Sequence, residues 1–141
     1  MIIVDTGAFL ALFNRIDPFH REAEIAFRSV QESLITTYPV ITETCYLLAK
    51  FSGIQAEITF LRQVASEIVE VFDLQRRHIE RAIALMERYA DLPMDFADAS
   101  LVVLAEHLNH GRILTVDRRD FLTYRWNNTQ PFENLMRMSE E

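Results

Sequence analysis

The sequence predicts an α/β fold in which helices pack on both faces of a mostly parallel central sheet. Short apolar runs such as Ile2–Val4 and Ile113–Val116 lack polar alternation, as is typical of strands buried on both faces. Segments with apolar residues at helical spacing separate these runs along the chain. The 141 residues are half apolar, which suffices for one domain with a sizeable core, and no linker or repeat divides residues 1–141.

The first half of the chain predicts two strands and four helices. The strands are expected over Ile2–Val4 and Leu34–Thr37. The helices are expected over Ala8–Phe13, from Asp17-Pro18 to about Val30, over Pro39–Ser52 and over Ile54–Ser66. Proline is favoured in the first helical turn and glycine just after the last turn, which accounts for starts at Pro18 and Pro39 and an end at Gly53.

The second half predicts further strands and helices in alternation. Strands are expected over Ile68–Phe72 and Ile113–Val116 and near Pro131–Leu135. Helices are expected over Gln75–Tyr89 and Asp95–Asn109, with a turn or short helix over Asp117–Phe121. Leu92-Pro93 separates the two longer helices, and Gly111 is expected to end the second of them.

Acidic residues stand at the expected carboxyl ends of two strands. Ile-Ile-Val-Asp5 and Ile-Leu-Thr-Val-Asp117 end in the same way, and ligands of open parallel sheets bind at that edge. Glu43 and Asp98 lie in the first turns of helices, at the border of the stripes expected to face inward, and Asp95 precedes the second of these helices. Each acid alone could instead cap a helix or complement its dipole.

A divalent cation would reconcile these acids with one another. Clustered carboxylates repel each other and raise each other's pKa values unless a cation is present. Carboxylate oxygens without His or Cys favour Mg²⁺ or Mn²⁺ over Zn²⁺, and such an ion suits phosphoryl chemistry. The sequence therefore predicts a magnesium or manganese site built from Asp5, Glu43, Asp98 and Asp117.

The charge balance limits how this chain could attract a polyanion. The formal net charge is −7, whereas nucleic-acid binders usually show a basic face, so RNA attraction would have to be local. Arg118 and Arg119 follow Asp117 and are candidates for phosphate contacts, although plain surface exposure is an equal alternative. Cys45 is the single cysteine, which favours a reducing compartment. We expect a cytoplasmic protein without signal peptide or membrane span.

Four motifs together resemble the PIN-domain family, and most closely its VapC-type toxin ribonucleases. The motifs, in chain order, are Val-Asp5-Thr-Gly-Ala-Phe, Thr-Glu43, Phe-Ala-Asp98-Ala and Leu-Thr-Val-Asp117-Arg-Arg-Asp-Phe. The resemblance implies a three-layer α/β/α sandwich in which the four acids hold one or two Mg²⁺ or Mn²⁺ ions. It further implies hydrolysis of single-stranded RNA by metal-activated water to leave a 5′-phosphate, a cognate antitoxin protein as partner, and a homodimer.

The resemblance also assigns lesser roles to three neighbouring residues. Thr6 and Thr115 match small hydroxyl positions near the site, where Thr6 would position water or, as we slightly favour, cap the next helix. Asp95 is expected to cap its helix, with an outer position in the acidic site as the alternative. Tyr124 and Trp126 could stack on a base, with packing as the more ordinary use.

The sequence also suggests functions other than cleavage of single-stranded RNA. A phosphoacceptor domain also uses an Asp after a parallel strand but needs a nearby Lys, and the only lysine, Lys50, falls in the second half of a helix. A catalytically silent PIN-like binding module, and a nuclease acting on structured RNA or DNA, remain open alternatives. The intact set of acids favours a catalyst.

Overall fold

A computed structural model describes residues 1–137, and the last four residues of the domain expected over 1–141 lie outside the described residues. The central sheet has five strands in the order β3-β2-β1-β4-β7, and every neighbouring pair is parallel. These strands are β1 (Ile2–Val4), β2 (Leu34–Thr37), β3 (Val69–Phe72), β4 (Arg112–Leu114) and β7 (Glu133–Asn134). The predicted parallel α/β class is confirmed.

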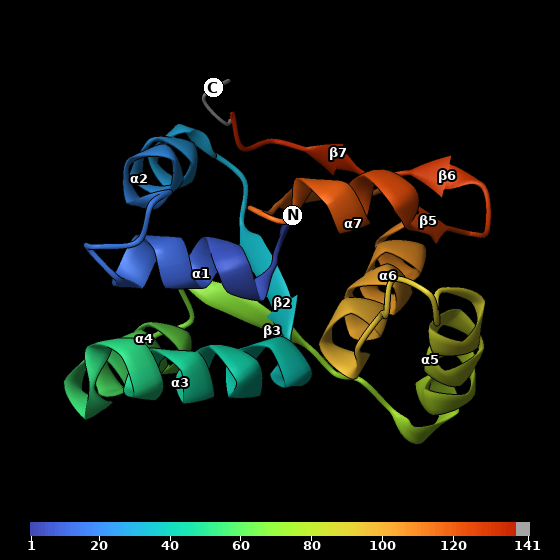
Figure 1. Ribbon diagram of the computed structural model, residues 1–141, viewed down its shortest axis with the longest axis horizontal. Helices are drawn as coiled ribbons and strands as arrows, with labels where there is room; N and C mark the ends of the chain where they lie inside the picture. The colour runs from blue at the N-terminus through green and yellow to red at the C-terminus, as the bar shows by residue number, and fades with distance from the viewer. Residues whose placement is uncertain (138–141) are drawn as a thin grey trace.

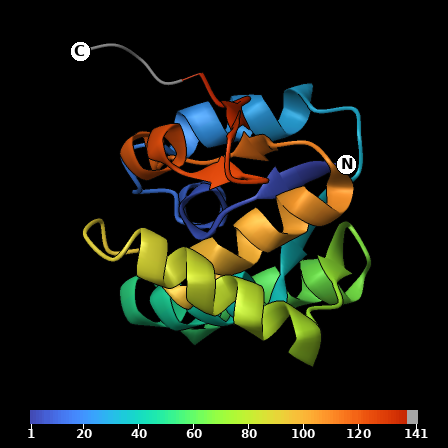
Figure 2. The same ribbon diagram turned by 90° about the vertical axis from the view of Figure 1, so that its right-hand side faces the viewer.

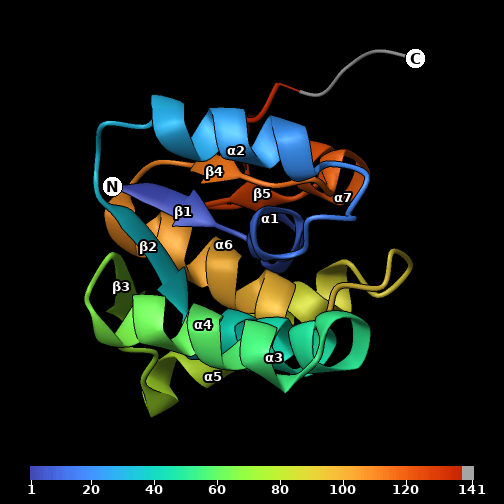
Figure 3. The same ribbon diagram turned by 90° about the vertical axis from the view of Figure 1, so that its left-hand side faces the viewer.

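Helices cover both faces of this sheet. They are α1 (Thr6–Phe13), α2 (His20–Ser29), α3 (Tyr38–Ser52), α4 (Ile54–Ala65), α5 (Arg76–Arg88), α6 (Phe96–Leu108) and α7 (Arg118–Thr123). Figure 1 shows α1, α2 and α4 on one side of the strands and α5 and α6 on the other. Seen from the left, β1 and β2 run between α2 and α4 (Figure 3). The predicted three-layer sandwich is therefore the observed architecture.

The interior is centred on β1 and α6. Ile2, Ile3 and Val4 are all almost completely buried, as expected for a strand with a neighbour on each edge and helices on each face. Helix α6 is buried nearly all round, because it packs on β1 and β2 while α5 covers its outer side (Figure 2). No helix among the described residues is both long enough and apolar enough to span a bilayer.

Apolar residues at helical spacing on α3 and α5 predict a buried stripe on each helix, and the structure buries only part of each stripe. On α3, Val40, Thr44 and Leu48 are buried as expected, whereas the side chain of Phe51 is 61% exposed. On α5, Ala82 faces the core but Ile79 and Ile83 are partly exposed. The stripe that tertiary packing buries on each helix is therefore narrower than the spacing of its apolar residues suggests.

Three predicted boundaries are wrong for identifiable reasons. Helix α1 begins at Thr6 rather than Ala8, because Asp5 already caps it. Helix α2 begins at His20 rather than near Asp17, whose carboxylate accepts a hydrogen bond from the Phe19 amide and closes a turn instead. Helix α6 ends at Leu108, one residue before the predicted end, because Asn109 is a left-handed cap with φ of 60°, and Gly111 lies beyond that cap.

The C-terminal strand prediction is half right. The segment expected near Pro131–Leu135 divides between β7, which extends the main sheet, and β6 (Gln130–Pro131). Strand β6 pairs antiparallel with β5 (Arg125–Trp126) to form a separate hairpin. The turn between them places Asn127 and Asn128 at positive φ, which asparagine tolerates better than most residues.

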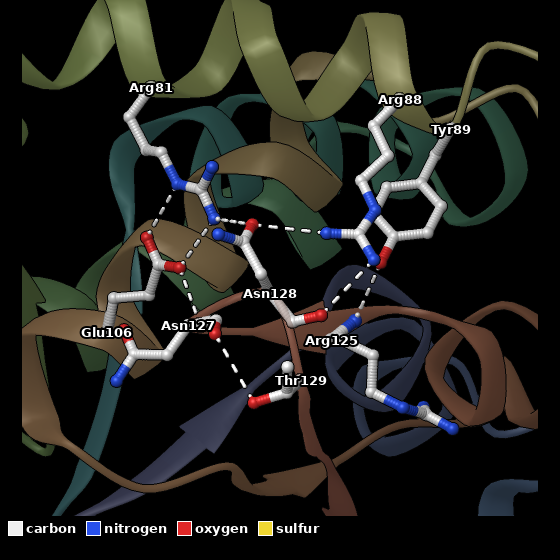
Figure 4. Close-up of polar contacts among 8 residues, drawn as sticks. All are labelled: Arg81, Arg88, Tyr89, Glu106, Arg125, Asn127, Asn128 and Thr129. Carbon is white, nitrogen blue, oxygen red and sulfur yellow. Dashed lines mark hydrogen bonds and ion pairs between the residues drawn. The ribbon is translucent and has the colours of Figure 1, made fainter.

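A polar network attaches this hairpin to the outer helices (Figure 4). Arg81 of α5 makes a bidentate ion pair with Glu106 of α6, with N–O distances of 2.9 and 2.8 Å. Arg81 and Arg88 both donate to the Asn128 side-chain oxygen, and the Arg125 amide donates to the Tyr89 hydroxyl. The network fixes the hairpin, and with it the preceding Tyr124, against α5 and α6.

Candidate active site

The sheet order creates a switch point at the carboxyl ends of β1 and β4. The chain passes from β1 to β2 on one side and later returns to β4 on the other side of β1. Asp5 directly follows β1, and Thr115 and Asp117 follow β4, so all three lie at this switch point. Gly7 allows close approach, because a Cβ there would overlap the Val116 side chain. The two predicted strand-end acids are therefore neighbours.

Asp5 is the most enclosed of the acids, with 6% of its surface exposed. Its two oxygens accept hydrogen bonds from the Thr6 amide at 2.6 Å and the Thr115 hydroxyl at 2.7 Å. Burial raises the pKa of the Asp5 carboxyl to about 7, and the charges of Asp117 and Glu43 add to that effect. The two hydrogen bonds oppose the rise in pKa without cancelling it.

Asp98 faces the same acids from α6. Burial, followed by the charges of Asp5, Asp95 and Asp117, raises the pKa of the Asp98 carboxyl to about 8. One Asp98 oxygen accepts a hydrogen bond from the Tyr124 hydroxyl at 3.0 Å. Asp95 caps α6 by accepting from the Asp98 amide at 2.8 Å, as its predicted capping role requires.

Glu43 reaches the site from α3 and is half-buried. Burial raises the pKa of the Glu43 carboxyl, and the charge of Asp95 raises it further. The Thr6 hydroxyl lies toward this carboxyl and lowers its pKa, yet it is buried without a partner at hydrogen-bonding distance. The favoured prediction that Thr6 caps α1 is wrong, because the cap is the Asp5 carboxylate.

Asp117 has two structural links beside its place among the acids. Its carboxylate caps the short helix α7 by accepting from the Asp120 amide at 3.2 Å. Its own amide donates to the Thr115 hydroxyl at 2.9 Å, and that hydroxyl in turn donates to Asp5. Burial and the neighbouring Asp120 raise the pKa of the Asp117 carboxyl. Thr115 thus joins the two strand-end acids directly.

Two supporting residues escaped the sequence interpretation. Tyr124 is fully buried and holds Asp98, although base stacking and plain packing were the roles considered for it. The side-chain amide of Asn134, on β7, makes two hydrogen bonds with the Thr115 backbone. Its oxygen accepts from the Thr115 N–H at 3.2 Å, and its nitrogen donates to the Thr115 carbonyl at 3.0 Å. Only β4–β7 pairing reveals this contact, because nothing in the local sequence around Asn134 distinguishes it.

The arginines of β4 and α7 divide into one that is paired and two that are not within residues 1–137. Arg112 forms an ion pair with Glu32 and is thereby occupied. Arg118 and Arg119 are exposed at the start of α7, and neither has an ion-pair partner within residues 1–137. The Nδ1 atom of the His20 ring lies 2.7 Å from the Ala11 carbonyl oxygen.

The donor set suits a hard divalent cation. Each of the four carboxylates has lone pairs beyond those used in the hydrogen bonds described above, and the buried, unpartnered Thr6 hydroxyl adds a further oxygen. Within residues 1–137, no group of three or more His, Cys, Asp or Glu side chains is arranged so that it could hold a metal ion. Burial, together with the charges of neighbouring acids, raises the pKa values of Asp5 and Asp98, and a bound cation would oppose both effects.

Comparison with known proteins identifies the family of this chain. A family model described as the PIN domain matches residues 2–126. Ribonuclease VapC26 of Mycobacterium tuberculosis is 35% identical over 124 residues, which cover 88% of this chain and 92% of that protein.

Two solved structures share the fold. Mycobacterium tuberculosis VapC20, described as a sarcin-ricin loop cleaving toxin, superposes with a TM-score of 0.73 and 25% identity over 77% of this chain and 84% of that chain. A toxin–antitoxin complex from Klebsiella pneumoniae gives a TM-score of 0.64 and 19% identity over 87% of this chain and 92% of that one. With its acids gathered at the switch point and the family model matching almost its whole length, the chain belongs to the PIN-domain family, alongside the VapC-type ribonucleases.

Proposed function

We propose that this protein is a metal-dependent endoribonuclease and the toxin of a type II toxin–antitoxin pair. Its substrate is RNA, and its cofactor is Mg²⁺ or Mn²⁺, as one or two ions. Asp5, Glu43, Asp98 and Asp117 hold the cofactor. The named activity of the 35% identical relative, a ribonuclease, supports the reaction class.

The observation that carries the proposal is the gathering of acids at one sheet edge. Asp5 and Asp117 come from adjacent strand ends, and Asp98 experiences the charges of both. A fold gains nothing from placing like charges in a half-buried crevice, so the arrangement is best explained by a bound cation. Such a cation, when bound, supplies the positive charge that activates a water and stabilises the departing oxygen of a phosphodiester.

The protein's own residues orient this chemistry. Thr115 holds one Asp5 oxygen and the Asp117 amide, and Tyr124 holds one Asp98 oxygen. These hydrogen bonds restrict the rotation of the Asp5 and Asp98 carboxylates. The raised pKa values of Asp5 and Asp98 mean that protons compete with the cation near neutral pH, so cation binding should release protons.

RNA cleavage with and without metal tests the proposal. Labelled single-stranded RNA is incubated with the wild type, Asp5→Asn and Asp98→Asn in Mg²⁺ or Mn²⁺, and with the wild type in EDTA. Asp91→Asn serves as the control, since Asp91 is an exposed carboxylate in the loop between α5 and α6. We expect cleavage only by the wild type and the control, and only with metal.

Three outcomes would contradict parts of this scheme. Equal cleavage by Asp5→Asn and the wild type would exclude the carboxylate site as the catalyst. Cleavage of no RNA by any variant would favour the silent binding module over the enzyme, and a preference for duplex substrates would favour the structured RNA or DNA alternative.

The partner proposals have their own tests. The toxin–antitoxin complex among the similar structures supports an antitoxin partner, expected as the product of a neighbouring small reading frame. Co-expression should give a co-purifying complex with suppressed cleavage. We also propose a homodimer and a cytoplasmic location, the latter consistent with a single cysteine. Light scattering on the purified chain decides the first, and cell fractionation the second.

A further inference from the structure

We propose that a cavity beside the acids is a nucleotide subsite, which holds one unpaired nucleotide of the RNA strand next to the bond that is cut. This inference rests on the proposed ribonuclease function and assigns a substrate-binding element to it. The cavity lies between α7 and the C-terminal segment and has a volume of about 550 Å³. Its lining residues are Thr115, Arg118, Phe121, Leu122, Phe132, Asn134, Met136 and Arg137.

The cavity borders the proposed catalytic centre through Thr115, although none of the four acids lines it. Thr115 lines it, and the Thr115 hydroxyl donates to Asp5 and accepts from the Asp117 amide. A ligand in the cavity therefore lies one residue away from two of the four acids. An RNA strand with the phosphate to be cleaved at the acids would place an adjoining nucleotide here.

The cavity combines cations with an apolar wall. Arg118 and Arg137 both line it, and neither has an ion-pair partner within residues 1–137. Leu122, Phe132 and Met136 supply the apolar surface. On a chain with a net charge of −7, two unpaired guanidinium groups beside one apolar wall fit a ligand with an anionic end and a flat apolar face. A nucleotide has both.

The polar wall is rigid and retains a donor. The Asn134 amide oxygen accepts from the amides of Thr115 and Met136, and its nitrogen donates to the Thr115 carbonyl. A side-chain amide has two N–H donors, and only one of them has a partner within residues 1–137. The second can donate to an acceptor on a base edge without any rearrangement of Asn134.

The structure also separates two arginines that the sequence could not rank. Arg118 lines the cavity, whereas its neighbour Arg119 does not. Both are exposed and carry the same charge. Their substitution removes equal charge from almost the same position in the chain, so any difference between them measures the cavity and not the net charge.

Binding without cleavage tests the subsite. A fluorescein-labelled oligouridylate of about twelve nucleotides is titrated with full-length protein in EDTA, and anisotropy is followed across a range of salt concentrations. We expect Arg118→Gln and Arg137→Gln each to weaken binding about tenfold at low salt and to reduce the salt slope by about 0.7. Arg119→Gln should change the affinity less than twofold.

The apolar wall has a separate readout. Leu122 is 68% exposed, so Leu122→Ser should fold normally, which circular dichroism checks. It should weaken binding about threefold at every salt concentration, because it removes apolar contact and no charge. Uridine monophosphate should displace the probe at a lower concentration than inorganic phosphate does.

Each contrary result overturns the proposal. Equal loss in Arg118→Gln and Arg119→Gln would assign the binding to net charge alone. Equal competition by phosphate and uridine monophosphate would show that no base is bound. Absence of probe binding in EDTA would remove the subsite while leaving metal-dependent cleavage by the wild type unaffected, so failure here is distinguishable from failure of the proposed enzyme activity.

Discussion

The replacement Asp5→Asn should stabilise the metal-free protein at alkaline pH, even though it disables the proposed site. Asp5 is almost completely buried, and its carboxyl has a pKa raised from 3.8 to about 7. A group whose pKa is higher in the folded state binds its proton more tightly there, so its contribution to stability is complete below pH 3.8. That contribution falls as the pH rises and is lost once the pH passes about 7.

The size of the effect follows from the shift in pKa. A difference of about 3 pKa units corresponds to an upper limit of about 4 kcal/mol between pH 3 and pH 8. Asparagine has no charge to lose, and its amide can still accept from the Thr6 amide and donate to the Thr115 hydroxyl. Asp5→Asn should therefore remove the contribution of Asp5 to the pH dependence, while Asp98, whose pKa is also raised, keeps its own contribution.

Urea denaturation in EDTA from pH 4 to pH 8 measures the effect. The wild type should lose stability across this range, and the gap to Asp5→Asn should widen as the pH rises. The exposed control Asp91→Asn should follow the wild type. Added Mg²⁺ should restore stability to the wild type and to Asp91→Asn, but not to Asp5→Asn. A free energy of unfolding for Asp5→Asn that falls in parallel with the wild type would refute the argument that Asp5 is buried as an uncompensated acid.

Three further substitutions test the surrounding scaffold, each by denaturant unfolding. Tyr124→Phe removes the hydrogen bond to Asp98 and should lower the free energy of unfolding by about 1 kcal/mol. It should also lower the affinity for Mn²⁺ measured by calorimetry, and an unchanged affinity would show that Tyr124 does not orient Asp98. Arg81→Ala leaves Glu106 without its bidentate partner and should cost about 1–3 kcal/mol, and a neutral result would mean that the network contributes nothing. Gly53→Ala should cost about 1–3 kcal/mol because φ there is 87° with nothing nearby to clash, so an unaffected variant would contradict backbone strain as the cause.

The sequence predicted the fold through patterns that depend on nearest neighbours. The unbroken apolar run Ile2–Val4 identified a strand buried on both faces, and it is the central strand of the sheet. Gly53 marked the end of α3, where a positive φ is required. Boundaries failed where a side chain closed a competing local turn, as Asp17 does before α2.

The candidate site was predictable to the same extent. Asp5 and Asp117 end strands of the same kind, and parallel strands bring such ends to one edge, so chain order and pattern alone placed them together. The sequence could not decide that Asp5 itself caps α1, because Asp5 and Thr6 are both good capping residues. The choice between them depends on the tertiary contacts of each side chain.

Only the tertiary structure decided the contacts that join distant segments. Asn134 meets Thr115 because β7 pairs with β4, and Tyr124 meets Asp98 because the preceding helix returns the chain to α6. Arg118 differs from Arg119 for the same reason, since only the cavity formed with the C-terminal segment separates them. Local sequence patterns locate the acids, but the residues that orient them come from distant segments. Local propensity does not encode which distant segments meet.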